Sequence, residues 1–160
     1  MFDGNSGNYR QEIITNDGFW PDVDLLEFQK SRSLPTSIDT DFLADALLNT
    51  ITEINGELIS VKNQHHAKGY QQAAEVPGVQ RNGRNALCAQ YLKAVFARAK
   101  ADLLGEYSSI VNRAPNSQQE SPELRNRLLA ESSLVIRNMK GLKRATVTMI
   151  WANCSNSPPF

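Results

Sequence analysis

The sequence is poor in the residues that define disulfide-rich, metal-binding and membrane proteins. Its 160 residues include only two cysteines and two histidines. Cys88 and Cys154 lie far apart, so we expect two free thiols in a reducing compartment rather than a disulfide. Because no stretch of about 18 residues lacks charge, we predict no transmembrane helix and no membrane partner. The N-terminus also lacks the basic and apolar segments of a secretion signal.

Motifs for catalysis and cofactor binding are also missing. His65 and His66 are adjacent, so on a helix they diverge by about 100° and are poorly placed to share a metal ion. We expect solvated or helix-end histidines. No glycine-rich phosphate loop, Walker motif or HExxH is present, and Ser, Cys and His form no recognisable nucleophile arrangement. The sequence therefore predicts a protein that is not an enzyme and that carries no metal and no cofactor.

Charge is balanced in total but unevenly distributed. Residues 1–60 contain 11 acidic and 3 basic residues, a balance of −8, whereas residues 61–160 contain 6 acidic and 14 basic residues, a balance of +8. Two interpretations stay open: the halves pack on each other or pair head to tail between copies, or they are separately solvated faces. The basic run 137–144 fits a helix dipole more simply than nucleic acid. An acidic run, Asp39, Asp41 and Asp45, is explained more simply by helix capping than by catalysis.

The longest helical pattern runs from Arg84 to Arg113. At about 28 residues this helix is about 42 Å long, and we predict that it forms the centre of the domain. Four alanines between residues 94 and 101 favour a helix and leave room for close neighbours. Apolar side chains recur at helical spacing, and they are Cys88, Leu92, Val95, Ala99, Leu103, Tyr107 and Ile110.

Three further helices are expected. A short one follows the aromatic anchor 19–21, is capped by Asp22 or Asp24 and ends near Ser33. A second begins at Asp39 or Thr40 and continues to Lys68–Gly69, where the pair caps its end. Gly56 interrupts this helix, and a close helix crossing would explain it. The third is capped by Ser121, has Pro122 at its first position, and ends at Gly141. Apolar side chains at helical spacing form a stripe along one face of the second helix, and they are Leu43, Leu47, Ile51, Ile54, Leu58 and Val61.

The two ends of the chain differ from the helical part. Residues 1–18 read as an arm, with one β-prone run at 12–15. Residues 146–151 are β-prone and have no evident partner except 12–15. We therefore predict an all-α fold: a bundle of three long helices plus a short N-terminal helix, with an extended N-terminal arm and a β-prone C-terminal arm. The expected divisions are 1–18, 19–144 and 145–160. Phe19 and Trp20 are expected in the core, whereas core and interface are equally open for Trp151.

The ordered pattern resembles the head-completion proteins of P2-like tailed bacteriophages. The likeness covers about residues 19–150 and rests on the order and spacing of its pieces. Residues 1–18 and about ten residues after Ile150 depart from the family pattern. The matching pieces are Phe19–Asp24, Thr52–Leu58, Gly69–Tyr70, Ala74–Gly78, Tyr91–Val95, Leu103–Tyr107 and Val147–Ile150.

This resemblance implies a structural virion protein made in the host cytoplasm and located at the head–tail neck. Such proteins look like helical adaptors that form a ring, typically of twelve copies, beneath the portal. They close the DNA-filled head and offer a platform for the tail. The implied partners are the portal protein, a tail-side neck or tail-terminator protein and further copies of the chain. Packaged DNA would pass through the lumen without specific binding.

Two groups of residues are candidates for these contacts. The unpaired β-prone end and the terminal aromatic residues favour docking on the portal through Val147, Met149, Ile150, Trp151 and Phe160. The opposite charges of the two halves favour subunit contacts through Asp39, Asp41, Asp45, Arg137, Lys140, Lys143 and Arg144. The alternative function is a helical DNA-binding regulator, for which neither loop offers the spacing of a helix-turn-helix.

Overall fold

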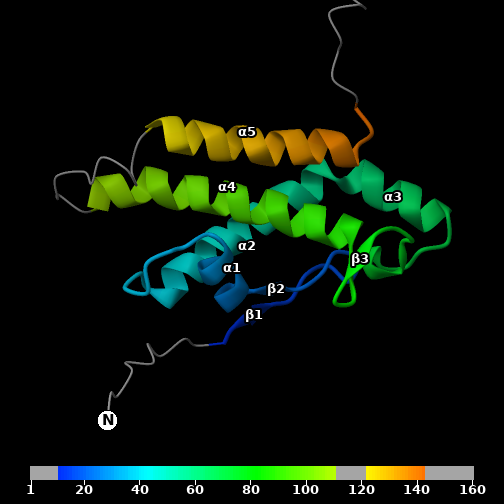
Figure 1. Cartoon of the computed structure of the whole chain (residues 1–160), viewed down its shortest axis with the longest axis horizontal. Helices are drawn as coiled ribbons and strands as arrows, with labels where there is room; N and C mark the ends of the chain where they lie inside the picture. The colour runs from blue at the N-terminus through cyan, green and yellow to red at the C-terminus, as the bar shows by residue number, and fades with distance from the viewer. Residues whose placement is uncertain (1–10, 111–121, 143–160) are drawn as a thin grey trace, which may run out of the picture.

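The computed structural model describes residues 11–110 and 122–142 of the chain. This part is mostly helical, as predicted, and also contains two short two-stranded sheets (Figure 1). The α-helices are α1 (Leu25–Ser31), α2 (Thr40–Glu57), α3 (Ile59–Ala67), α4 (Ala86–Ile110) and α5 (Pro122–Met139). The strands are β1 (Ile13–Ile14), β2 (Val23–Asp24), β3 (Gln80–Arg81) and β4 (Arg84–Asn85), and a 3-10 turn spans Ala73–Glu75.

Helix α4 lies at the centre of the described structure. It packs against α5 on one side and α2 on the other, and these are the two most extensive helix–helix contacts (Figure 1). The predicted stripe is buried from Cys88 to Leu103, which confirms that part of the helix pattern. The side chains of Tyr107 and Ile110 lie outside those described. The opposite side of α4 is buried too, which a single apolar stripe did not predict.

Small residues make the contact between α4 and α5 close. Ala97 and Ala101 are fully buried and form a separate cluster with Leu128 of α5. Ser132 of α5 donates its hydroxyl to the Ala94 carbonyl of α4 at 3.0 Å, in a buried position. This hydrogen bond satisfies the hydroxyl, which would otherwise be costly to bury between two helices. The alanines therefore allow α4 to be covered on its second side.

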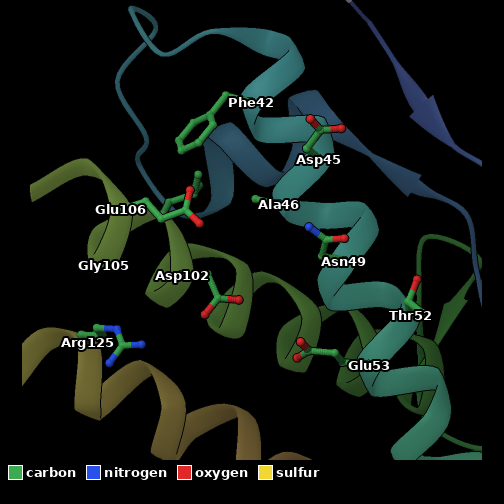
Figure 2. A pocket seen from close by; sticks show the side chains of 11 residues that line it. Phe42, Asp45, Ala46, Asn49, Thr52, Glu53, Asp102, Gly105, Glu106 and Arg125 are labelled. Atoms are coloured by element: carbon green, nitrogen blue, oxygen red, sulfur yellow. The ribbon is translucent and has the colours of Figure 1, made fainter. Parts of the chain in front are cut away.

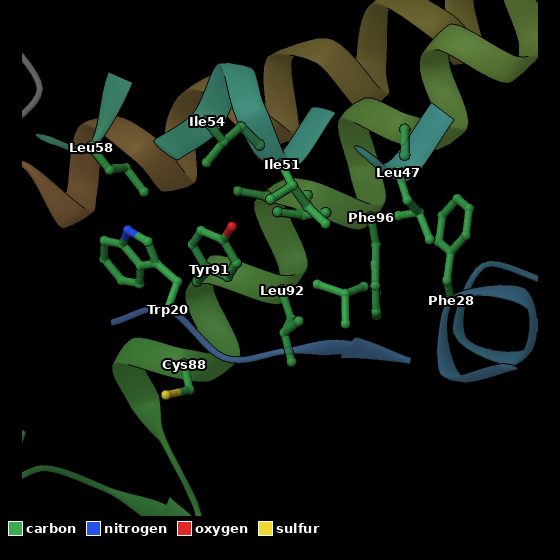
Figure 3. Packing of buried hydrophobic residues seen from close by; sticks show 14 of the residues in the cluster. Trp20, Phe28, Leu47, Ile51, Ile54, Leu58, Cys88, Tyr91, Leu92 and Phe96 are labelled. Atoms are coloured by element: carbon green, nitrogen blue, oxygen red, sulfur yellow. The ribbon is translucent and has the colours of Figure 1, made fainter. Parts of the chain in front are cut away.

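Larger side chains fill the other side of α4. Leu47, Ile51 and Ile54 of α2 lie over this side, while Phe28 of α1 packs on Phe96 with ring centroids 5.2 Å apart (Figure 3). Burial of such side chains contributes about 1.5–3 kcal/mol each before conformational entropy is counted. The main core is therefore shared by α1, α2 and α4, with Val135 and Ile136 of α5 at its border, and the smaller cluster around Leu128 lies on the alanine side of α4.

The expected second helix is divided in the structure. α2 ends at Glu57, Leu58 adopts φ −97° and ψ 10°, and α3 begins at Ile59. Leu58 and Val61 stay buried, so the predicted stripe continues across the break. A Cβ atom added at Gly56 would meet nothing within 4 Å, so the expectation of a close helix crossing there is wrong. Helices α2 and α5 also have few direct contacts, so the helices are layered around α4 rather than all packed on each other.

The segment before α1 packs on the helices. β1 pairs with β2 in antiparallel register, with Ile13 opposite Asp24. The β-prone run at 12–15 thus has a partner in β2, and the run at 146–151 lies outside the described residues. Asn16 then joins the segment to two helices: its amide nitrogen donates to the Tyr91 hydroxyl at 2.9 Å, and its amide oxygen accepts from Asn55 at 2.8 Å. Residues 11–18, which we expected in an arm, therefore pack on the helices.

A tight hairpin leads into α4. β3 pairs with β4, and the two residues between them, Asn82 and Gly83, have positive φ angles of 51° and 78°. Such a turn matches the twist of its flanking strands. The helix predicted from Arg84 begins at Ala86 instead, because Asn85 caps it: its side-chain oxygen accepts from the Cys88 amide at 2.9 Å.

The other helix boundaries follow the sequence signals. Asp24 caps α1 and Asp39 caps α2, each by accepting a backbone N–H two residues later. Pro122 is the first residue of α5, as predicted, and Ser121 lies outside the described residues. Gly69 and Gly141 follow α3 and α5 with φ angles of 94° and 72°, conformations that favour glycine.

The close α4–α5 contact predicts that Ala97→Leu destabilises the protein by about 1–3 kcal/mol, because the added atoms have no space at a fully buried position. Urea unfolding measures the change. Ala89→Leu, at an exposed position of the same helix, is the matched control and should change stability by less than about 0.5 kcal/mol. Equal effects of the two substitutions would contradict the close packing.

Gly56→Ala should increase the free energy of unfolding by about 0.5–1 kcal/mol, because alanine favours the helical backbone and meets no neighbour there. The control is Gly69→Ala, which places a Cβ on a backbone with φ 94° and should destabilise by more than about 1 kcal/mol. A loss of stability in Gly56→Ala would show that the break after α2 requires glycine.

Candidate functional site

An open groove lies between α2 and α4 in the described surface. Its volume is about 950 Å³. Figure 2 shows α2 along one wall, α4 along the other and Arg125 of α5 at the edge. The lining residues are Phe42, Asp45, Ala46, Asn49, Thr52, Glu53, Asp102, Leu103, Gly105, Glu106 and Arg125.

Helical spacing places these side chains on the groove walls. Asp45, Asn49 and Thr52 recur every three or four residues, and Glu53 follows directly, so they form one flank of α2. The neighbouring positions Leu47 and Ile51 are buried against α4. The groove therefore lies along the polar border of the same contact that builds the main core.

The groove is acidic. Four carboxylates line it, and Arg125 is its one basic lining residue, a formal balance of −3. Burial raises the pKa of the Asp102 carboxyl, and the negative charge of Glu53 raises it further, while Arg125 and Arg98 act in the opposite direction. Arg98 is itself engaged by Glu57 and, at 3.8 Å, by Glu53. A cationic group entering the groove would relieve this repulsion.

Gly105 provides space for the basic side chain at the groove edge. A Cβ atom at this position would lie 3.2 Å from Nε of Arg125. With hydrogen in place of a side chain, α4 lets the guanidinium of Arg125 lie across it beside the acidic wall (Figure 2). The carboxylate of Asp102 and this guanidinium attract each other across the groove.

A basic surface lies at the end of α5. Arg137, in the last turn, is exposed, and Lys140, directly after the helix, is half-buried. The end is closed by backbone hydrogen bonds from Leu142 to the Arg137 carbonyl and from Gly141 to the Asn138 carbonyl, both 3.0 Å. These bonds hold the two cations at a fixed helix terminus, where the helix dipole also favours positive charge.

The structure separates the predicted acidic and basic contact residues. Figure 1 places the start of α2 and the end of α5 toward opposite ends of the long axis of the molecule. Asp39 caps α2, Asp41 is exposed beside it, and Asp45 lies in the groove. Lys143 and Arg144 lie outside the described residues, as do the portal-docking candidates Val147, Met149, Ile150, Trp151 and Phe160.

Sequence reasoning missed most of the groove. Glu53, Asp102 and Glu106 were not among the predicted contact residues, although Asp102 and Glu106 are four residues apart on the predicted central helix. Their spacing indicated a shared face, but only the packing of α2 beside α4 brings Glu53 to it.

The histidines and the described cysteine, which could have taken part in chemistry, pack within the fold. His65 and His66 lie in the last turn of α3, half-buried beside Phe19, with ring centroids 6.2 and 5.0 Å from it. Cys88 is a buried free thiol, and burial raises its pKa. Within residues 11–110 and 122–142, no three potential ligands gather into a metal site. No helix of this part has the length and hydropathy to cross a bilayer.

The described part is a predominantly helical protein with an acidic groove and a basic helix end at separate places. Comparison with known sequences identifies the class more closely: the chain belongs to the phage head completion protein (GPL) family, which it matches over residues 14–150. This result confirms the resemblance found in the sequence.

Two relatives support the assignment. The chain is 34% identical over 150 residues to the probable head completion/stabilization protein of Haemophilus phage HP1, covering 94% of this chain and all of the relative. It is 28% identical over 100 residues to the head completion/stabilization protein of Escherichia phage P2, covering 62% of this chain and 59% of that protein. No solved structure matches the chain significantly.

The raised pKa of Asp102 predicts that Asp102→Asn stabilises the protein at pH 7. The charged carboxyl opposes folding there, whereas protonation removes this opposition. The gain should therefore disappear as the pH falls below 3.8, the ordinary value of the group. Thermal unfolding between pH 3 and 8 measures the effect.

Asp17→Asn is a control, because its effect on stability at pH 7 should have the opposite sign. Burial alone would raise the Asp17 pKa, but hydrogen bonds from Lys62 and from the backbone of Phe19 and Trp20 hold it below its ordinary value. Its charged form therefore stabilises the fold, and Asp17→Asn should lower the melting temperature at pH 7. A destabilising effect of Asp102→Asn at pH 7 would contradict the predicted repulsion in the groove.

Proposed function

We propose that this chain is a head-completion adaptor that forms a ring between the portal and the tail neck. In this position it closes the DNA-filled capsid and provides the platform to which the tail attaches. Membership of the phage head completion family supports a structural role in the virion. The observation that carries the adaptor function is the separation of an acidic groove and a basic helix end on one rigid helical body.

This separation suits association between unlike surfaces. When one copy offers its acidic surface to the basic surface of the next, each contact leaves one of each surface open for another copy. Such heterologous contacts generate a closed ring when the rotation between copies divides a full turn. The proposed number of twelve copies rests on the resemblance to ring-forming neck proteins.

The partners in this proposal lie on the two sides of the ring. The C-terminal arm from residue 145 docks on the portal, with Val147, Met149, Ile150, Trp151 and Phe160 as the contact residues. A tail-side neck or tail-terminator protein binds the other face. DNA passes through the lumen without base-specific contact, and the protein has no catalytic step and needs no cofactor.

A DNA-binding regulator is less well supported. The groove between α2 and α4 carries a formal charge of −3, which repels a phosphate backbone. Salt-dependent binding of the purified chain to duplex DNA, with affinity falling steeply between low and physiological salt, would favour the regulator. An increase in mass on adding portal protein would favour the adaptor.

Deleting residues 145–160 should abolish binding to the purified portal while leaving the far-ultraviolet helix signal nearly unchanged, because the helices of the described region end at Met139. A full-length control replaces Val147, Met149, Ile150 and Trp151 by serine, which tests the side chains without shortening the chain. Binding can be measured by sedimentation with portal rings. Undiminished binding of both variants would overturn the docking role of the arm.

A further inference from the structure

We propose that the acidic groove between α2 and α4 receives the basic end of α5 from a second copy of the chain. This inference rests on the proposed function, since it specifies the contact through which copies would join. The contact runs from Asp45, Glu53 and Asp102 on one copy to Arg137 and Lys140 on the next.

Charge complementarity selects this occupant. After Glu131 the sequence contains no acidic residue to its end at Phe160. The same stretch contains four basic residues, which fall within eight positions: Arg137, Lys140, Lys143 and Arg144. The groove carries a formal balance of −3 and holds Asp102 in a position where burial and Glu53 disfavour its charge. Cations brought into the groove stabilise all of its carboxylates together.

The basic end cannot fill the groove of its own chain. Arg125, at the groove edge, and Arg137 lie on the same helix, 12 residues apart, which corresponds to about 18 Å. Lys140 lies a further three residues away, and the closed helix end at Gly141–Leu142 fixes its direction. Arg137 and Lys140 must therefore reach such a groove from another molecule.

The groove dimensions are compatible with a helix end. Its volume of about 950 Å³ is open along one side, and its walls are α-helices rather than mobile loops. The lining also includes Phe42 and Leu103, which give apolar contact to the side-chain stems of arginine and lysine. The contact is heterologous, because groove and helix end are different surfaces, so it propagates from copy to copy.

Reciprocal charge reversal tests the contact. The groove variant carries Asp45→Lys and Glu53→Lys, and the end variant carries Arg137→Glu and Lys140→Glu. Each alone places like charges together, so association between copies should weaken by about 100-fold or more. The two variants mixed should associate again, because the reversed groove side chains then face the reversed side chains at positions 137 and 140, and each unchanged groove faces an unchanged end, in alternating order. A chain carrying all four substitutions should also recover.

The matched control is Arg127→Glu, which reverses an exposed charge on α5 that does not line the groove, and it should leave association unchanged. Mass measurement in solution with portal as template reports assembly, and thermal unfolding confirms that each variant is folded. If a groove variant is unfolded, Asp45→Asn with Glu53→Gln replaces it and should weaken association less. Weakening by either reversal without recovery in the mixture would overturn the pairing.

Disulfide trapping locates the contact in assembled particles. Asn49→Cys, in the groove, and Asn138→Cys, in the last turn of α5, are introduced together with Cys154→Ser; Cys88 is buried. Oxidation should link neighbouring copies into a ladder of multimers. A link confined to single chains, or no link in particles that contain the protein, would overturn the groove contact and leave the proposed function standing. Absence of the protein from particles would instead overturn the proposed function.

Discussion

Burial of α4 on two opposite sides is the constraint on which the rest of the structure depends. Leu92, Val95 and their neighbours form the main core with α1 and α2, to which α5 adds two residues, whereas Ala97 and Ala101 form a separate cluster with Leu128 of α5. Both contacts are possible because one side of α4 is bulky and the other is nearly bare. The molecule is therefore layered. α5 packs closely on a face of α4 where large side chains would have prevented this contact. Arg32 reinforces the arrangement by reaching from the end of α1 to Glu131 of α5 at 2.9 Å.

This layering also places the charged surfaces. α5 lies along α4, so its first turn brings Arg125 to the groove, and its last turn places Arg137, and Lys140 just after the helix, away from it. A helix of 18 residues, about 27 Å long, separates the two kinds of charge within one rigid body. Opposite charges that cannot meet within a molecule remain available between molecules. The length of α5 thus gives a physical basis to the adaptor function proposed for this chain, because it keeps the acidic and basic surfaces apart.

Much of the fold could be predicted from the sequence, because helical periodicity, capping aspartates and Pro122 are local signals. The arrangement around α4 could not, since alanine reads equally well as a helix former and as an interface residue. The break between α2 and α3 at Leu58 is not marked by a proline, and the apolar stripe continues across it, so no signal in the sequence predicted it. Asn16 gave no sign that it would join Asn55 and Tyr91. Of the groove, only Asp45 was predicted, because its other acids come together through tertiary packing.

The aromatic contact beside Asn16 has a practical consequence. Trp20 is 2% exposed and stacks on Tyr91, with ring centroids 4.7 Å apart and planes 6° from parallel. It is the one tryptophan within the described residues, and it belongs to the segment that Asn16 and Asp17 fasten to the helices. Its indole therefore acts as a built-in optical reporter: release of that segment would move the ring into water and shift its emission to longer wavelength.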